Sequence, residues 1–261
     1  MKTKDRSMLK WLALVTWVII FIIWTVTTNG GFVNTRLVPT PQKTWQTFLD
    51  ILQHGYNGVL LSHQMGMSLS RLGIAVFFAL ITALPMGLLS GYFLPFRALV
   101  DSVVQFYRPL PPLSYYTLLI LWLGIGESSK IVLLYLAAFA PLYVASASAV
   151  DTVNDTYILS ARSLGASSWQ VFFSVILPAC LPQIFTGLRT AVGVAYTTLV
   201  AAEMVAATSG IGWMVIDASR YLKSDVMFVG IILMGITGIL LDRMIVLLEK
   251  GIVFWKGKEG E

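Results

Sequence analysis

A single arginine stands inside a long apolar run, where its charge could attract an anion. Arg108 lies about nine residues into the run 99–123, at a depth of about 13 Å for a rise of 1.5 Å per residue. A lone arginine at that depth costs about 2.5–3.5 kcal/mol on insertion scales. Arg108 is therefore expected to face a partner, water or a solute path.

Three prolines follow this arginine closely. Pro109, Pro111 and Pro112 remove backbone N–H donors and must interrupt a helix, which is tolerated inside a membrane where the freed carbonyls are buried in protein or face a cavity. The pattern predicts a broken helix beside a cation, a suitable lining for an anion path. Snorkelling of Arg108 to the cytoplasmic interface, with prolines that only kink the helix, accounts for the same residues equally well.

An acidic residue occurs near the outer end of another apolar run. Glu203 lies about twenty residues into the run 184–206, and the small-residue loop after it contains Gly210 and Gly212. An acid in this place could pair with a basic group, for example on a second copy of the chain, and form an outer gate. The simpler interpretation is an interfacial acid with access to water.

A short helix with one apolar face is predicted between two apolar runs. Tyr157, Ala161 and Leu164 recur at i, i+4 and i+7, after Asn154 or Asp155 as the N-cap. Apolar side chains at this regular spacing need a partner surface. We therefore predict a docking helix here in preference to a solvated loop.

A second helix signal begins directly after this docking helix. Gly165 suits the left-handed residue that ends a helix, and Ser167 with Gln170 makes a capping box for the next one. Pro178 marks the predicted end of the apolar stretch that follows the capping box. The segment 151–178 is therefore predicted to form a compact helix–turn–helix elbow.

This elbow resembles the cytoplasmic signature loop of the permease subunits of binding-protein-dependent ABC importers. Gly165, Val175 and the pair Leu177-Pro178 match that loop, although isoleucine is usual in place of Val175. The triplet before the glycine reads Leu-Ser-Ala instead of an acid and two alanines. Three further runs look like the taurine, alkanesulfonate and nitrate subgroup, taurine permeases most of all: Arg-Pro-Leu-Pro-Pro at 108–112, Trp-Leu-Gly-Ile-Gly-Glu-Ser-Ser-Lys at 122–130 and Leu-Val-Ala-Ala-Glu at 199–203.

The resemblance implies partners and a cargo. It implies two copies of a separate ATPase subunit, which would bind ATP and Mg²⁺, and an extracytoplasmic solute-binding protein that delivers a small anion. Taurine or another alkanesulfonate is the expected cargo, with nitrate or a heterocyclic vitamin precursor as alternatives. The side chains that would couple to the ATPase are Tyr157, Ala161, Leu164, Gly165, Leu177 and Pro178.

The chain lacks the sequence signals of an enzyme. It contains no G-x-x-x-x-G-K-[ST] phosphate loop, so ATP hydrolysis is expected on another polypeptide. An intramembrane enzyme would need a nucleophile and a base at depth, yet His54 and His63 fall outside the predicted spans. A self-powered secondary transporter would need coupling-ion residues at mid-membrane and often shows internal repeats. We predict no catalytic residue, no metal site and no cofactor on this chain.

The composition indicates a polytopic all-α membrane protein. Hydrophobic residues make up 57% of the chain and charged residues 12%, with a mean hydropathy of +0.78. The net charge of +5 is better explained by membrane topology than by nucleic-acid binding. The single cysteine, Cys180, excludes an intrachain disulfide framework and a cysteine-rich metal site.

Six apolar runs are long enough to span a membrane, at roughly 20 residues each. If the first begins in the cytoplasm, the elbow and both termini lie inside, and lysine and arginine are then more frequent inside than outside. One set of spans with one elbow predicts a homodimer, and the resemblance implies a location in a bacterial inner membrane. The predicted runs are 11–26, 72–93, 99–123, 131–150, 184–206 and 226–248.

Four segments follow from this topology. Residues 1–28 form an N-terminal membrane anchor span, and residues 29–67 form an external loop with an interfacial amphipathic helix that begins at Pro41. Residues 68–248 form a five-span permease core that includes the coupling loop 151–178. Residues 249–261 form a cytoplasmic tail.

Overall fold

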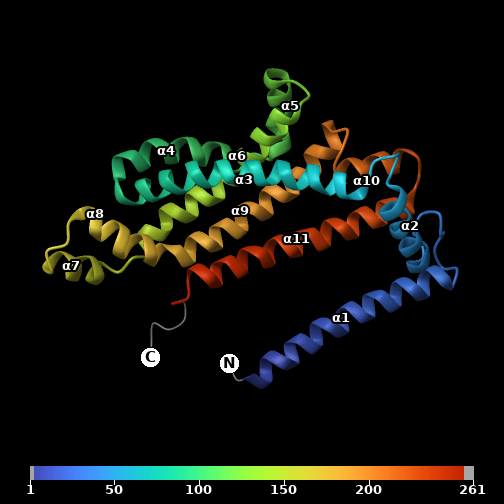
Figure 1. The fold of residues 1–261 in the computed structure, drawn as a ribbon, viewed down its shortest axis with the longest axis horizontal. Helices are drawn as coiled ribbons and strands as arrows, with labels where there is room; N and C mark the ends of the chain where they lie inside the picture. The colour runs from blue at the N-terminus through green and yellow to red at the C-terminus, as the bar shows by residue number, and fades with distance from the viewer. Residues whose placement is uncertain (1–2, 256–261) are drawn as a thin grey trace. The chain divides into compact units, whose positions relative to one another are not determined.

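The computed structural model describes residues 3–255, with side chains from residue 11 onward, and nearly all of this chain is helical (Figure 1). Among these residues the only strand-like pairing is an isolated bridge between Tyr56 and Val59. The predicted all-α class is confirmed. The helices are α1 (Thr3–Asn29), α2 (Pro41–His54), α3 (Leu61–Tyr92), α4 (Leu94–Tyr107), α5 (Pro112–Leu123), α6 (Glu127–Asp151), α7 (Asp155–Ser163), α8 (Ser168–Val171), the π-helix η1 (Phe172–Ile176), α9 (Leu177–Ala206), α10 (Ile211–Arg220) and α11 (Ser224–Ile252).

Five described helices are long and apolar enough to cross a membrane, whereas the sequence predicts six spans. The difference is the run 99–123, which is divided between α4 and α5. Proline supplies no backbone N–H, so Pro109, Pro111 and Pro112 cannot continue the helical hydrogen bonds. The expected interruption after Arg108 is present, and the single span predicted here is corrected to two short helices. The five helices are Trp11–Asn29, α3, α6, the continuous segment Ser168–Ala206, and α11.

The second helix of the elbow is longer than the sequence predicts. Helix α8 continues through η1 into α9, so Pro178 lies within a continuous helix and does not end one. Pro178 has no N–H for the carbonyl of Ser174, and Ser174 lies in the π-helical turn. A π-helical turn changes the hydrogen-bond pattern from i−4 to i−5, which lets the helix pass a residue that cannot donate.

The described chain divides into two compact units. The first consists of the described part of Met1–Gln64 together with Met214–Leu233, and the second of Met65–Trp213 with the described part of Met234–Glu261. The predicted cytoplasmic tail begins inside α11, which ends at Ile252, and its residues 256–261 lie outside the described residues.

Helix α2 in the first unit is fixed by its cap and by polar contacts. Thr40 accepts a hydrogen bond from the N–H of Lys43, and Pro41 occupies the first helical position. The buried side of α2 carries threonine, and Thr47 donates to Asp225 over 2.9 Å. The apolar side chain of Trp45 stays 61% exposed, so an interfacial position for α2 remains a prediction.

Helices α6 and α9 form the centre of the second unit. They pack extensively on each other, and α3 lies along α6 (Figure 1). Small residues permit this approach: a Cβ added to Gly187 would lie 2.2 Å from the Cβ of Ala145. This close packing places the side chains of α3, α4, α6 and α9 that form the two regions described next.

Candidate functional site

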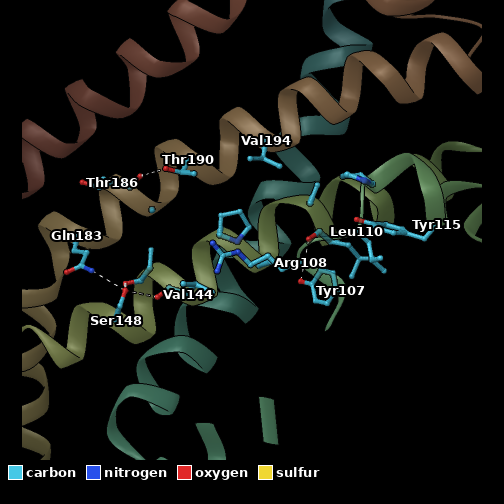
Figure 2. A pocket seen from close by; sticks show the side chains of 17 residues that line it. Tyr107, Arg108, Leu110, Tyr115, Val144, Ser148, Gln183, Thr186, Thr190 and Val194 are labelled. Atoms are coloured by element: carbon cyan, nitrogen blue, oxygen red, sulfur yellow. Dashed lines mark hydrogen bonds between the residues drawn. The ribbon is translucent and has the colours of Figure 1, made fainter. Parts of the chain in front are cut away.

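Arg108 lies at a cavity of about 480 Å³ between α6, α9 and the connection from α4 to α5. In Figure 2 its side chain reaches from this connection toward the wall that α6 and α9 form. Of the three prolines, only Pro112 lines the cavity, so Pro109 and Pro111 contribute through the break in the helix. The predicted arrangement of a cation beside an interrupted helix is therefore present.

Arg108 is the only charged side chain among the 17 described residues that line the cavity. It is exposed, and it makes no ion pair with any other described residue. A guanidinium carries five N–H donors and no acceptor, so its hydrogen-bonding groups are available to a solute or to water. We call this region the Arg108 cavity.

Glu203 lies in a different region of the same unit and is fully paired. Its side chain is 1% exposed, and its carboxylate accepts hydrogen bonds from the Ser68 hydroxyl over 2.7 and 3.0 Å and from the Gly212 N–H over 2.9 Å. The Nη1 atom of Arg71 lies 2.7 Å from its Oε1 atom. The interpretation of Glu203 as an acid with access to water does not fit this burial, and its basic partner belongs to the same chain.

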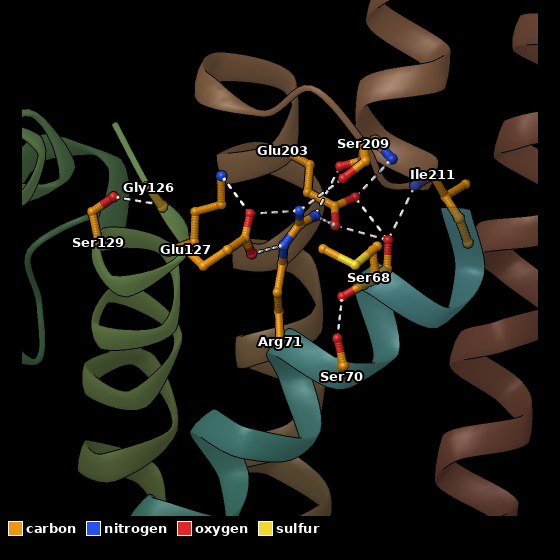
Figure 3. Close-up of polar contacts among 12 residues, drawn as sticks. Ser68, Ser70, Arg71, Gly126, Glu127, Ser129, Glu203, Ser209 and Ile211 are labelled. Atoms are coloured by element: carbon orange, nitrogen blue, oxygen red, sulfur yellow. Dashed lines mark hydrogen bonds and ion pairs between the residues drawn. The ribbon is translucent and has the colours of Figure 1, made fainter. Parts of the chain in front are cut away.

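Arg71 connects three helices at this point (Figure 3). From α3 it donates to Glu203 in α9, to Glu127 in α6 through Nη2 over 2.9 Å, and to the Ser209 carbonyl over 2.8 Å. Lys130 adds a contact of 3.1 Å to Glu127, so two cations and two carboxylates balance. We call these residues, together with Ser68, the Arg71 cluster.

Sequence reasoning missed Arg71 as a site residue because it placed the residue before the predicted start of a span at 72. Helix α3 begins eleven residues earlier than that start, at Leu61, and carries Arg71 to a site where its side chain is 2% exposed. The apolar residues Met65, Met67 and Leu69 between these points are the signal that could have extended the span.

Two glycines allow the loop after Glu203 to close over its carboxylate. Gly210 has a φ of +119°, and a Cβ there would lie 2.3 Å from the carboxyl carbon of Glu203. At Gly212 a Cβ would lie 2.7 Å from the Val200 carbonyl oxygen and 2.9 Å from the Glu203 Cβ. The predicted grouping of Glu203, Gly210 and Gly212 is therefore real, and both glycines are required by close approach.

The elbow begins with the capped helix α7 and turns at a glycine. Asn154 accepts a hydrogen bond from the Thr156 N–H, Gly165 has a φ of +84°, and the side chains of Ser167 and Gln170 form a complete capping box. These local features agree with the sequence signals, because each depends on residues within one or two turns of the chain.

The six candidate coupling residues do not all lie on one exposed surface. Tyr157 and Leu164 are 62% and 89% exposed, whereas Ala161 and Leu177 pack against a buried cluster that contains Val171 and Ile176. The face expected to hold Tyr157, Ala161 and Leu164 together is therefore divided, because Ala161 turns toward the protein. Gly165 supplies the left-handed backbone conformation of the turn, and Pro178 lies within the continuous helix.

Comparisons with known proteins agree with this architecture. The family of binding-protein-dependent transport system inner membrane components matches residues 79–254. The chain is 38% identical to the taurine transport system permease protein TauC of Escherichia coli (strain K12) over 248 residues, which cover 95% of this chain and 90% of that protein. It is 30% identical to the nitrate import permease protein NrtB of Synechocystis sp. (strain ATCC 27184 / PCC 6803 / Kazusa), with 90% and 86% covered.

A solved structure has the same fold. A chain of the MetNI methionine ABC transporter, in a structure described as inward facing, superposes with a TM-score of 0.63 at 19% identity over 72% of this chain and 93% of that one. The family match covers the elbow, the Arg108 cavity and Glu203, and five helices have the length and apolarity of membrane spans. The chain is therefore a multi-pass membrane protein that belongs to the family of inner membrane components of binding-protein-dependent transport systems.

Proposed function

We propose that the chain is the membrane-spanning subunit of an ATP-driven importer that carries a small sulfonate anion, taurine or another alkanesulfonate, into the cell. Its family and its similarity to a taurine permease support this role. Nitrate remains the alternative cargo that a relative's name supports, and a heterocyclic vitamin precursor is a further one.

The observation that carries the proposal is the Arg108 cavity. An exposed guanidinium without an ion pair among the described residues can bind the oxygens of an oxyanion through several N–H donors at once. The volume of about 480 Å³ lies in the range of small-molecule sites. Its lining is mostly apolar, which suits the short hydrocarbon part of an alkanesulfonate.

The pairing of the acidic side chains favours an ATP-driven importer over a self-powered transporter. A secondary transporter needs ionisable groups that can bind a coupling ion. Glu203 is already neutralised by Arg71, and Glu127 contacts both Arg71 and Lys130. The family match and the lack of a phosphate-loop motif support a further part of the proposal, that two copies of a separate subunit bind ATP and Mg²⁺ and hydrolyse ATP. The exposed Tyr157 and Leu164 of the elbow give that subunit an apolar contact.

We base the remaining parts of the proposed assembly on the topology that the sequence predicts. One set of spans pairs with a second copy of the chain, and a binding protein delivers the solute outside. The elbow and both termini then face the cytoplasm, and the Arg71 cluster lies toward the outer side. There it joins α3, α6, α9 and the loop at Ser209, and can serve as an outer gate that opens when these elements separate.

Co-purification with an ATPase subunit tests the proposal. The chain is expressed with the ATPase encoded beside it and purified through a tag on this chain alone. The complex is reconstituted in lipid, and ATP hydrolysis is measured with a candidate binding protein that is empty or loaded with taurine. We expect a stable complex whose hydrolysis rises with the loaded binding protein. A chain that retains no ATPase in any detergent or lipid would contradict the importer.

Charge reversal tests the path in the same preparation. Arg108→Glu is expected to abolish uptake of labelled taurine into proteoliposomes while the complex still assembles. Arg189→Gln controls for the loss of a positive charge elsewhere, because Arg189 is another exposed arginine, bonded to Asp242 and outside the cavity lining. Normal uptake by Arg108→Glu would remove this residue from the path.

A further inference from the structure

The wall of the Arg108 cavity that faces the arginine offers hydrogen-bond acceptors and few donors. The hydroxyls of Thr186 and Thr190 in α9 donate to the carbonyls of Pro182 and Thr186, over 3.0 and 3.1 Å. The Ser148 hydroxyl in α6 donates to the Val144 carbonyl over 2.8 Å. A hydroxyl has one proton and two lone pairs, so each of these oxygens has used its donor inside the helix and keeps acceptor capacity.

The amide in the same wall is partly committed. Gln183 donates one of its two Nε2 hydrogens to the Ser148 hydroxyl over 3.1 Å, and its Oε1 lies 3.2 Å from the Thr152 hydroxyl. Pro141 in α6 lines the cavity and has no N–H, so the Ala137 carbonyl one turn earlier receives no helical hydrogen bond from it. Figure 2 shows Thr186 and Thr190 along α9, the bonded pair Ser148 and Gln183, and Arg108 reaching toward this wall.

The cavity therefore has two chemically different ends. Arg108 provides donors and a positive charge, and the wall of α6 and α9 provides neutral acceptors. An alkanesulfonate without an amino group would accept hydrogen bonds from Arg108, and the acceptors of the wall would then bond only to water. An ammonium group carries three donors and no acceptor, so it complements such a wall.

Resting on the proposed function, we propose that this chain itself selects its cargo, and that the Arg108 cavity binds a short zwitterion with a sulfonate at one end and an ammonium at the other. Arg108 binds the sulfonate, and the hydroxyl oxygens of Thr186 and Thr190 accept from the ammonium. No carboxylate occurs among the described lining residues, so the ammonium is held by dipoles alone. A weak contact of this kind suits a site from which the solute must leave.

Equilibrium binding without any binding protein tests this inference, because the permease alone then sets the preference. The probes are radiolabelled taurine and ethanesulfonate, which differ in the amino group. They are dialysed against the nucleotide-free complex of this chain with its ATPase subunit in lipid nanodiscs. For the native chain we expect taurine to bind about tenfold more tightly than ethanesulfonate, the size of a charge-assisted hydrogen bond.

Substitution of the two threonines separates the two ends of the cavity. The double variant Thr186→Val, Thr190→Val keeps the side-chain size and removes both hydroxyl oxygens, so it should weaken taurine binding about tenfold and leave ethanesulfonate within about twofold. Thr186→Ser with Thr190→Ser restores the acceptors and should restore the preference. Arg108→Gln should weaken both probes about equally.

The control is Thr197→Val, also on α9, whose hydroxyl bonds the Val194 carbonyl over 2.9 Å outside the cavity lining. It should leave both affinities unchanged. Equal binding of the two probes by the native chain, or a preference for taurine that survives loss of both threonine hydroxyls, would overturn the zwitterion site. Absence of saturable taurine binding would overturn it as well. None of these results would contradict the importer, which is decided by co-purification and stimulated ATP hydrolysis.

Discussion

Two arginines of this chain lie in its second unit in opposite chemical situations. Arg71 is buried, and its guanidinium bonds Glu127, Glu203 and the loop at Ser209. Arg108 is exposed at a cavity and has no ion pair with a described residue. The difference shows that one charged side chain of this unit bonds neighbouring helices, whereas the other keeps its N–H donors available to a solute or to water. A role of Arg108 in transport is our proposal.

The Arg71 cluster and the Arg108 cavity are also expected to differ in what a substitution changes. Removal of one partner from a buried ion pair leaves an unpaired charge and is strongly destabilising, whereas an exposed and unpaired cation contributes little to the folded state. Changes in the Arg71 cluster should therefore act on unfolding, and changes in the Arg108 cavity on the solute. The following variants test this separation, beginning with the largest expected loss of stability.

Glu203→Ala should cause the largest loss. It leaves Arg71 Nη1, the Ser68 hydroxyl and the Gly212 N–H without their acceptor, at a cost of about 3–5 kcal/mol. The measurement is the thermal unfolding midpoint of the purified chain in detergent. Asp242→Ala is the control, because Asp242 and its partner Arg189 are 46% and 42% exposed and the loss of an exposed ion pair costs about 0–1 kcal/mol. Equal losses for the two variants would contradict the importance of the buried contacts of Glu203.

Gly210→Ala should cost about 1–3 kcal/mol for the backbone conformation alone, since φ is +119°. The added Cβ would also press on the Glu203 carboxylate. Combination with Glu203→Ala should cost less than the sum of the two single changes, because the clash is then gone. If the double variant loses as much stability as the two single variants together, the loop and the carboxylate do not interact.

Gly165→Val should cost less, about 1–2 kcal/mol, because only the left-handed conformation at φ +84° opposes it and no described atom lies within 4 Å of the added Cβ. Its main effect is expected on coupling: binding to the ATPase subunit or its stimulated hydrolysis should fall. Gly124→Val, also at a positive φ with free space around it, controls for backbone strain outside the elbow. Full stimulated hydrolysis by Gly165→Val would show that the turn does not transmit the motion.

Arg108→Gln should have the smallest effect on unfolding, with a midpoint unchanged within error, while taurine uptake into proteoliposomes falls at least about tenfold. Exposed cations without partners stabilise a fold little. A large drop in the unfolding midpoint would mean that Arg108 has a structural role, and the contrast with Arg71 would fail.

The sequence predicted well what depends on neighbouring residues. The interruption after Arg108, the cap at Asn154 and the turn at Gly165 each follow from the residues beside them. The continuation of the helix through Pro178 was not predicted, because a π-helical turn that absorbs a proline has no comparable local signal. The span that corresponds to α3 was predicted to start at residue 72, although α3 begins at Leu61. Arg71 was therefore not recognised as a site residue.

By itself, then, the sequence determined the class of the protein, most of its apolar spans and the turns, and it indicated the broken helix after Arg108 as one of two interpretations. These depend on composition and on contacts within a few residues. The tertiary structure alone decided which charges are paired. Arg71 and Glu203 are separated by 132 residues, and only the packing and rotation of α3 against α9 bring their side chains to 2.7 Å. The same packing leaves Arg108 at a cavity without a carboxylate partner: α6 and α9 form part of the cavity wall, but their acids Glu127 and Glu203 lie outside its lining.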